Sequence, residues 1–153
     1  MYTNILVAID GSDTAEQALT QAIDLAKALG SRIRLVHVAT ESDSIPADLP
    51  GVDIQAILQH VHDSGAAILA RARDRVSTAG VAVETRLVEA WSGQPGEEVI
   101  QQARQWPADL IVCGTHGRRG LRRILMGSDA EFVLRHTPVP VLLVRAQTMQ
   151  ERP

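Results

Sequence analysis

The chain has 153 residues, the length of about one domain. Its net charge of −3 excludes a coat protein that binds nucleic acid through bulk positive charge, and 3% aromatic residues are too few for a base-stacking surface. No segment approaches about 18 consecutive apolar residues, and the first residues lack the features of a secretory signal. The sequence therefore predicts one soluble, cytoplasmic domain over residues 1–153, with no membrane span and no nucleic-acid partner.

Short apolar runs typical of strands alternate with segments of helical period along the whole chain. The first run, NILVAID, is predicted to be a strand that ends at Asp10. In the helix after it, Asp13 and Glu16 are spaced as a helix start and Gly30 as a stop. The predicted strands are 4–10, 32–38, 81–88, 109–114 and 139–144. The other helices are predicted from Ile54 to a stop at Gly80, from Pro95 to Trp106 and from Ser128 to His136.

Five strands separated by helices need crossover connections, so the sheet should be mainly parallel. We expect a single α/β domain, in which an open five-stranded sheet carries helices on both faces. The longest irregular segment, ATESDSIPADLPGVD at 39–53, is rich in Pro, Ser and Asp and is predicted to be a flexible loop. A functional flap and an insertion without a role both remain open for it.

The segment GTHGRRGLRRILMGSDAEFV, residues 114–133, follows the fourth predicted strand. In an open parallel sheet, ligands bind beyond the carboxyl ends of the strands, and exposed N–H groups in a glycine-rich loop bind anions. A helix that starts at Ser128 adds a partial positive charge, which favours phosphate. The Walker A motif and the dinucleotide fingerprint require other glycine spacings, so neither fits.

The loop contains Gly114, Gly117, Gly127 and Ser128 in the pattern G-x-x-G, nine residues, G-S. That spacing resembles the nucleotide-binding signature of the universal stress protein family, in its ATP-binding branch. NILVAIDGSDTAEQAL near the start, LVHV, DLIVCGTHG and the closing TPVPVLLVR extend the resemblance over nearly the whole chain. The resemblance implies a Rossmann-like sheet with strand order 3-2-1-4-5.

The resemblance also implies that ATP binds across the strand ends. The residues that it implies for nucleotide binding are Ala8, Ile9, Asp10, Val38, Cys113, Gly114, Gly117, Gly127, Ser128 and Asp129. Val38 is expected to meet adenine through its backbone, and Cys113 and Gly114 to lie near the base and ribose. The last four residues are expected to hold the phosphates, with Asp129 acting through its backbone N–H or pointing away. Asp10 suits either the ribose hydroxyls or the support of a bound Mg²⁺, and both roles remain open.

Three further residues, His116, Arg118 and Arg119, are candidate phosphate contacts. Simpler interpretations also stand, because exposed arginines usually form a solvated face and a single histidine is commonly structural. Ser128 with Glu131 forms the capping-box pattern S-x-x-E, which explains both residues by helix-end chemistry. The sequence identifies no catalytic residue and no set of metal ligands.

Together with the resemblance, these features predict an ATP-binding regulatory protein of the stress response, acting as a nucleotide-dependent binding module or switch. The alternative is a slow ATP hydrolase or an adenylyl-transferring enzyme of a related α/β group, which needs an oriented nucleophile that the sequence does not identify. A phosphorylatable receiver domain is a third interpretation, but it needs an acidic cluster at the strand ends. Besides Asp10, the run RLVEAW supplies only Glu89.

The fifth strand, VPVLLV at 139–144, is expected at one edge of the sheet because Pro140 cannot donate to a central ladder. An apolar edge is prone to aggregation unless something covers it. Pairing with the same strand of a second chain predicts a homodimer, and the family resemblance implies the same. A higher oligomer and a protein partner remain open, and the alternative is a monomer whose edge is covered by AQTMQERP at the C-terminus.

Overall fold

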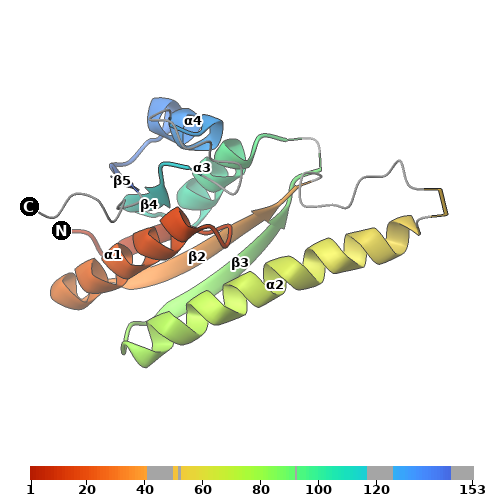
Figure 1. Cartoon of the computed structure of the whole chain (residues 1–153). Helices are drawn as coiled ribbons and strands as arrows, with labels where there is room; N and C mark the ends of the chain where they lie inside the picture. The colour runs from red at the N-terminus through yellow and green to blue at the C-terminus, as the bar shows by residue number, and fades with distance from the viewer. Residues whose placement is uncertain (41–49, 52, 92, 117–125, 146–153) are drawn as a thin grey trace, which may run out of the picture.

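The computed structural model describes residues 1–40, 50–51, 53–91, 93–116 and 126–145 (Figure 1). Most of the loop predicted at 39–53 lies outside the described residues, as do the site candidates Gly117, Arg118 and Arg119. The strands are β1 Asn4–Ala8, β2 Arg32–Ala39, β3 Val83–Glu89, β4 Leu110–Gly114 and β5 Val141–Val144. The helices are α1 Asp13–Leu29, α2 Ile54–Thr78, α3 Pro95–Gln105 and α4 Ser128–His136.

The strands form a 5-stranded parallel sheet in the order β3-β2-β1-β4-β5, which confirms the predicted α/β class and strand order. Helices α1 and α2 lie on one face of the sheet, and α3 and α4 lie on the other (Figure 1). From β1 the chain builds outward to β3 and then returns to add β4 and β5 on the other side. The direction of winding therefore reverses between β1 and β4, which is where open parallel sheets bind ligands.

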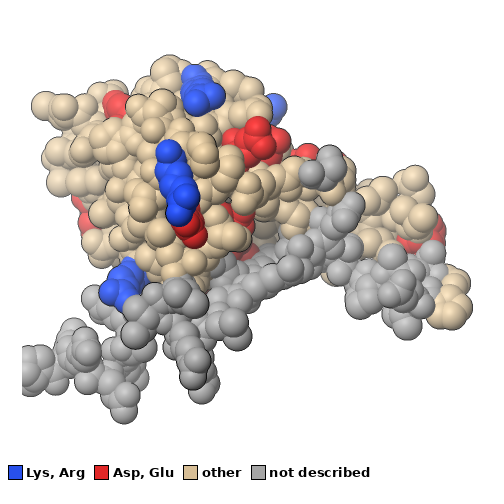
Figure 2. Space-filling view, turned by 90° about the horizontal axis from the view of Figure 1, so that it is seen from above, with Lys and Arg blue, Asp and Glu red and all other residues tan. Residues whose placement is uncertain are grey.

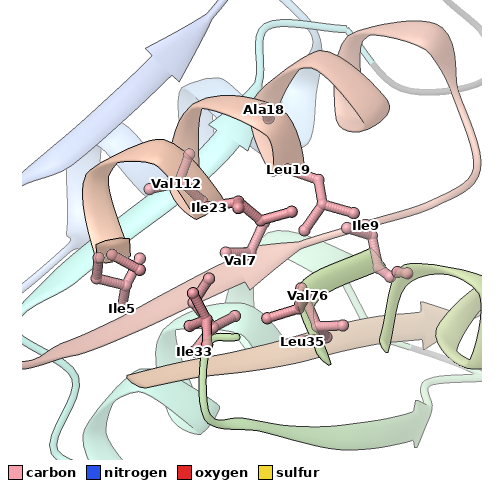
Figure 3. Close-up of a cluster of buried hydrophobic side chains, with 14 of the residues drawn as sticks. Ile5, Val7, Ile9, Ala18, Leu19, Ile23, Ile33, Leu35, Val76 and Val112 are labelled. Carbon is pink, nitrogen blue, oxygen red and sulfur yellow. The ribbon is translucent and has the colours of Figure 1, made fainter. Parts of the chain in front are cut away.

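The core has two layers because successive strand residues point to opposite faces of the sheet. In the β1 segment, Ile5, Val7 and Ile9 point toward α1 and α2, where they meet Leu19 and other buried side chains (Figure 3). Leu6 points to the opposite face, into a second cluster built with α3 and α4. This alternation fixes which side chains of β1 face α1 and α2 and which face α3 and α4.

Three predicted strand boundaries are wrong by two residues, each for a local reason, and three others, the ends of β2 and β3 and the start of β4, are wrong by one. β1 ends at Ala8 and not at Asp10, because its pairing stops at Val7 on the β4 side and at Ala8 on the β2 side. β3 begins at Val83, since Val81 N is bonded to the end of α2. β5 begins at Val141, after Pro140, which has no N–H to give to a ladder.

The longest helix, α2, has 25 residues and extends past the carboxyl ends of the strands (Figure 1). Its buried residues run from Val61 to Val76, whereas Ile54 in its first turn is 69% exposed. Neither α2 nor any other helix in the described ranges is long and apolar enough to cross a membrane.

Candidate functional site

The carboxyl end of the sheet is uneven because β1 is shorter than its neighbours. β1 ends at Ala8, which pairs with Val36, and β2 continues to Ala39. On the other side, β4 continues past Val112, its last residue paired with β1, to Gly114. Both neighbours therefore run past the end of β1 at the point where the winding of the chain reverses.

The backbone of Val38 faces the side of β2 that β1 leaves open. Backbone N–H and C=O groups along a central strand point alternately to its two neighbours. Val36 O accepts a hydrogen bond from Ile9 N at 2.9 Å on the β1 side, and Ala39 O accepts from Ala90 N at 2.9 Å on the β3 side. Val38 therefore directs its N–H and C=O toward the β1 side, beyond the last paired residue of that strand.

Gly114 does the same from β4. Thr115 N donates to Val144 O at 2.9 Å, so the backbone of Thr115, and that of Cys113 two residues earlier, points to β5. Gly114 lies between them and directs its backbone to the β1 side. Of the two residues expected near the base and ribose, Gly114 thus turns its backbone toward Val38, and Cys113 does not.

Gly114 has no room for a side chain. A methyl group there would lie 2.7 Å from Thr14 Oγ1 and 2.8 Å from Thr14 Cβ, at the start of α1. The Thr14 hydroxyl also donates to the carbonyl oxygen of His116, just after β4. The glycine therefore allows α1 to pack closely against the end of β4, and the two elements hold the strand end in place.

The N-terminus of α4 lies beside the same strand ends. Gly127 is its N-cap, and the Gly127 N–H donates to Thr115 O at 2.7 Å. The predicted capping box is not formed, because Ser128 is already the first helical residue and the N-cap, Gly127, has no side chain to make a cap bond. The N–H groups of Ser128 and Asp129 belong to the first turn, where they have no partner within the helix and suit an anion.

The Asp129 side chain binds α3 instead of its own helix. Its Oδ1 accepts from Gly96 N at 3.3 Å, in the first turn of α3. Burial raises the pKa of this carboxyl; the Gly96 hydrogen bond lowers it, and the negative charge of Asp10 raises it. Because its side chain is engaged by α3, Asp129 can meet an anion only through its backbone N–H.

Asp10 connects β1 to α1. Its Oδ1 accepts from Ser12 N at 2.9 Å, and Ser12 is the N-cap of α1, where its hydroxyl accepts from Ala15 N at 3.3 Å. The Asp10 carboxylate therefore lies at the N-terminal end of α1, and its negative charge contributes to the raised pKa of the Asp129 carboxyl in α4.

His116 is the last residue of the described range 93–116. Its Nδ1 lies 3.0 Å from Thr115 Oγ1. Its Nε2 is buried and has no hydrogen-bond partner among the described residues. A buried ring nitrogen in that position needs a partner, and a phosphate oxygen or a water would satisfy it.

Neither a reactive thiol nor a metal centre is built from the described residues. Cys113 is buried, and burial raises the pKa of its thiol to about 11, so the thiol is neutral at pH 7 and a poor nucleophile. Within the described ranges, no three His, Cys, Asp or Glu side chains are grouped to hold a metal ion. The groups at this edge are mainly backbone donors and acceptors, which suit ligand binding.

Figure 2 shows the molecule from above, the side on which α3 and α4 lie in Figure 1. On the described part of this surface, Lys and Arg side chains stand apart from one another, and one of them lies directly against an acidic side chain. The described residues therefore form no broad basic patch on this side of the molecule.

One polar residue beside the site, His37, was missed by the sequence analysis. It is 2% exposed, and its Nδ1 lies 2.8 Å from the carbonyl oxygen of Ile9. The signal was present in RIRLVHV, because a histidine inside a buried strand must find a hydrogen-bond partner. Sequence spacing alone does not identify that partner, which lies 28 residues earlier in the chain.

A sequence model described as the universal stress protein family matches residues 1–145. The chain belongs to the universal stress protein family. Universal stress protein YxiE of Bacillus subtilis is 33% identical over 151 residues, which cover 95% of this chain and 100% of that protein. A solved structure of a universal stress protein family member from Burkholderia pseudomallei is 36% identical, with a TM-score of 0.76, and the match covers 95% of this chain and 97% of that one.

Two other solved universal stress proteins were determined with nucleotides. One, in complex with cAMP, is 27% identical with a TM-score of 0.68, and the match covers 94% of this chain and 97% of that one. The other, from Archaeoglobus fulgidus in complex with dAMP, is 25% identical with a TM-score of 0.65, and covers 94% of this chain and 98% of that one. Universal stress proteins with this fold thus include proteins that bind adenine nucleotides.

Proposed function

We propose that this universal stress protein is an ATP-binding regulatory module of the stress response. The observation that carries the proposal is the set of groups at the carboxyl end of the sheet: outward backbone groups of Val38 and Gly114, the Asp10 carboxylate, and the N-terminus of α4. Backbone donors and acceptors suit a base, a carboxylate suits ribose hydroxyls, and a helix N-terminus suits phosphate. The cAMP and dAMP complexes of similar proteins support an adenine nucleotide as the ligand.

In this proposal, adenine binds the backbone of Val38, and the ribose lies near Gly114 and Asp10. The phosphates bind the N–H groups of Ser128 and Asp129 and reach Nε2 of His116. The remaining proposed contacts are Ala8, Ile9, Cys113 and Gly127 among the described residues, and Gly117, Arg118 and Arg119 outside them. If Mg²⁺ accompanies ATP, Asp10 is the carboxylate that would support it.

Nucleotide binding can regulate this protein because the site is bonded to the β5 edge. Thr115 receives a hydrogen bond from Gly127 N, at the start of α4, and donates one to Val144, at the end of β5. A phosphate bound to the N–H groups of the first turn of α4 would therefore be connected to β5 through these two hydrogen bonds. Occupancy of the site would then change the surface that β5 presents.

We further propose a homodimer formed through residues 139–144. The two edge strands differ in kind, because β3 exposes Glu84, Arg86 and Glu89, whereas β5 reads VLLV, with Leu142 37% exposed. Charged side chains protect an edge from further pairing, and an apolar edge favours it. A two-fold contact between copies of β5 would cover the apolar edge and close on itself.

The proposed function is tested by the nucleotide preference of the purified protein. Bound nucleotide is removed by unfolding, identified, and replaced by titration with ATP, ADP, AMP and cAMP, each with and without Mg²⁺. We expect ATP to bind most tightly and to remain intact over a long incubation. Preference for cAMP or AMP would contradict the ATP assignment, and turnover of ATP would favour the hydrolase.

A further inference from the structure

His37 makes a hydrogen bond that replaces a rung of the sheet. Ile9 N donates to Val36 O, so in an uninterrupted parallel ladder the carbonyl of Ile9 would accept from the N–H of Val38. That carbonyl instead lies 2.8 Å from Nδ1 of His37. A carbonyl oxygen can only accept, so Nδ1 carries the proton and donates it.

The bond from His37 to Ile9, which takes the place of a bond from the Val38 N–H, has two consequences at the proposed nucleotide site. The chain can leave the ladder at Ile9 with its last buried carbonyl satisfied, which sets the position of Asp10 immediately after it. The N–H of Val38, which the ladder would have used, stays directed beyond the end of β1. Both results follow from one side chain, because His37 directly precedes Val38 and reaches across to the residue before Asp10.

The imidazole is held in place by α2. A methyl group on Gly65 would lie 2.9 Å from Cδ2 of His37 and 2.8 Å from Cδ1 of Leu87. Glycine in the interior of a helix lowers helix stability relative to alanine. The close approach of α2 to the His37 ring explains why a glycine nevertheless stands at position 65. The ring is thus pressed from one side by α2 and bonded on the other to Ile9.

We infer that His37 is a positioning residue for nucleotide binding: by occupying the Ile9 carbonyl, it leaves the Val38 backbone open to the base and fixes Asp10 beside the ribose. The inference rests on the proposed function, since it assigns His37 to the base and ribose end of that site. It does not involve the phosphate end, which is built by α4. A ligand that carries only phosphates can therefore test the phosphate end of the site separately from the base and ribose end.

The test compares His37→Leu, which removes the donor, with His37→Asn, whose side-chain amide can donate from nearly the position of Nδ1. Gly65→Ala displaces the His37 ring with an added methyl group and leaves the His37 residue itself in place. Val76→Ala is the matched control, because Val76 is a fully buried side chain in the same core layer and lies about 16 Å along α2 from Gly65. Binding of ATP and of inorganic tripolyphosphate, which has no base or ribose, is measured by calorimetry beside thermal unfolding.

We expect His37→Leu and Gly65→Ala to lose about tenfold in ATP affinity, the effect of one hydrogen bond, while tripolyphosphate binding stays at the wild-type level. His37→Asn should restore most of the ATP affinity, and Val76→Ala should lower stability without this loss. Wild-type ATP affinity in a folded His37→Leu protein would overturn the inference, as would equal losses for both ligands or an equal loss in Val76→Ala. If His37→Leu does not fold, the same comparison between Gly65→Ala and His37→Asn decides. Failure of wild-type protein to bind ATP would instead overturn the proposed function itself.

Discussion

Replacing Ser128 with proline removes one backbone N–H from the start of α4 while preserving the helix. Proline is tolerated at the first helical position, where the N–H has no partner within the helix. The residue before a proline must be extended, and Gly127 already has φ −62 and ψ 150. Ser128→Pro therefore deletes a proposed phosphate donor with little change to the fold.

The size of the expected effect follows from the charge of the acceptor. A hydrogen bond to a charged group contributes about 1.5–3 kcal/mol, so its loss should weaken ATP binding by about 10-fold to 150-fold. Ser128→Ala is the matched control, because it removes the exposed hydroxyl and keeps the N–H. Its ATP affinity should equal that of the wild type. Both variants are measured by isothermal titration calorimetry, with thermal unfolding to check the fold.

Wild-type ATP affinity in a folded Ser128→Pro protein would refute the assignment of the α4 N-terminus to phosphate. An equal loss in Ser128→Ala would refute the backbone argument in another way, because it would assign the contact to the hydroxyl. Since the Asp129 N–H remains in both variants, we expect a partial and not a complete loss of binding.

Three further predictions concern charge and assembly. Asp10→Ala should weaken binding of ATP more than binding of dATP, because the ribose 2′-hydroxyl would lose its acceptor; a loss seen only with Mg²⁺ would instead assign Asp10 to the metal. Asp129→Asn should raise the unfolding temperature at pH 7. The pKa of the Asp129 carboxyl is raised in the folded state, so the folded protein loses stability as the pH rises above the ordinary pKa of an aspartate, about 3.9, and the carboxyl ionises. That gain should disappear as the pH falls toward 4, and a gain that is independent of pH would contradict it. Leu142→Asp should convert the dimer to a monomer in sedimentation experiments at about tens of micromolar protein. A wild-type protein that is monomeric at the same concentration would contradict the β5 interface.

The fold could be predicted from the sequence because its signals are local and repeated. β1, β4 and β5 are short apolar runs, β2 and β3 mix apolar with charged residues, and a helix such as α1 has a clear stop at Gly30, which adopts φ 70. Strand ends were less predictable. The run NILVAID continues to Asp10, and only pairing with two neighbours shows that β1 stops at Ala8.

The candidate site was predictable in outline and not in its contacts. The glycine spacing located the loop after β4, but the pattern S-x-x-E at Ser128 suggested a side-chain cap, whereas Gly127 is the N-cap. The bond from His37 to Ile9 and the contact of Thr14 with Gly114 join residues far apart in the sequence. Neither could be derived from spacing, because each depends on how a helix is placed on the sheet.

The central claim is that ATP binds at the carboxyl ends of the strands, and amide chemical shifts recorded during an ATP titration test it most directly. We predict that the largest shifts occur at Val38, Gly114, Ser128 and Asp129. The molecule has another concave surface, between α1 and α2, lined by residues that include Thr20 and Asp74. Shifts confined to that groove, or no shifts with millimolar ATP, would contradict the account.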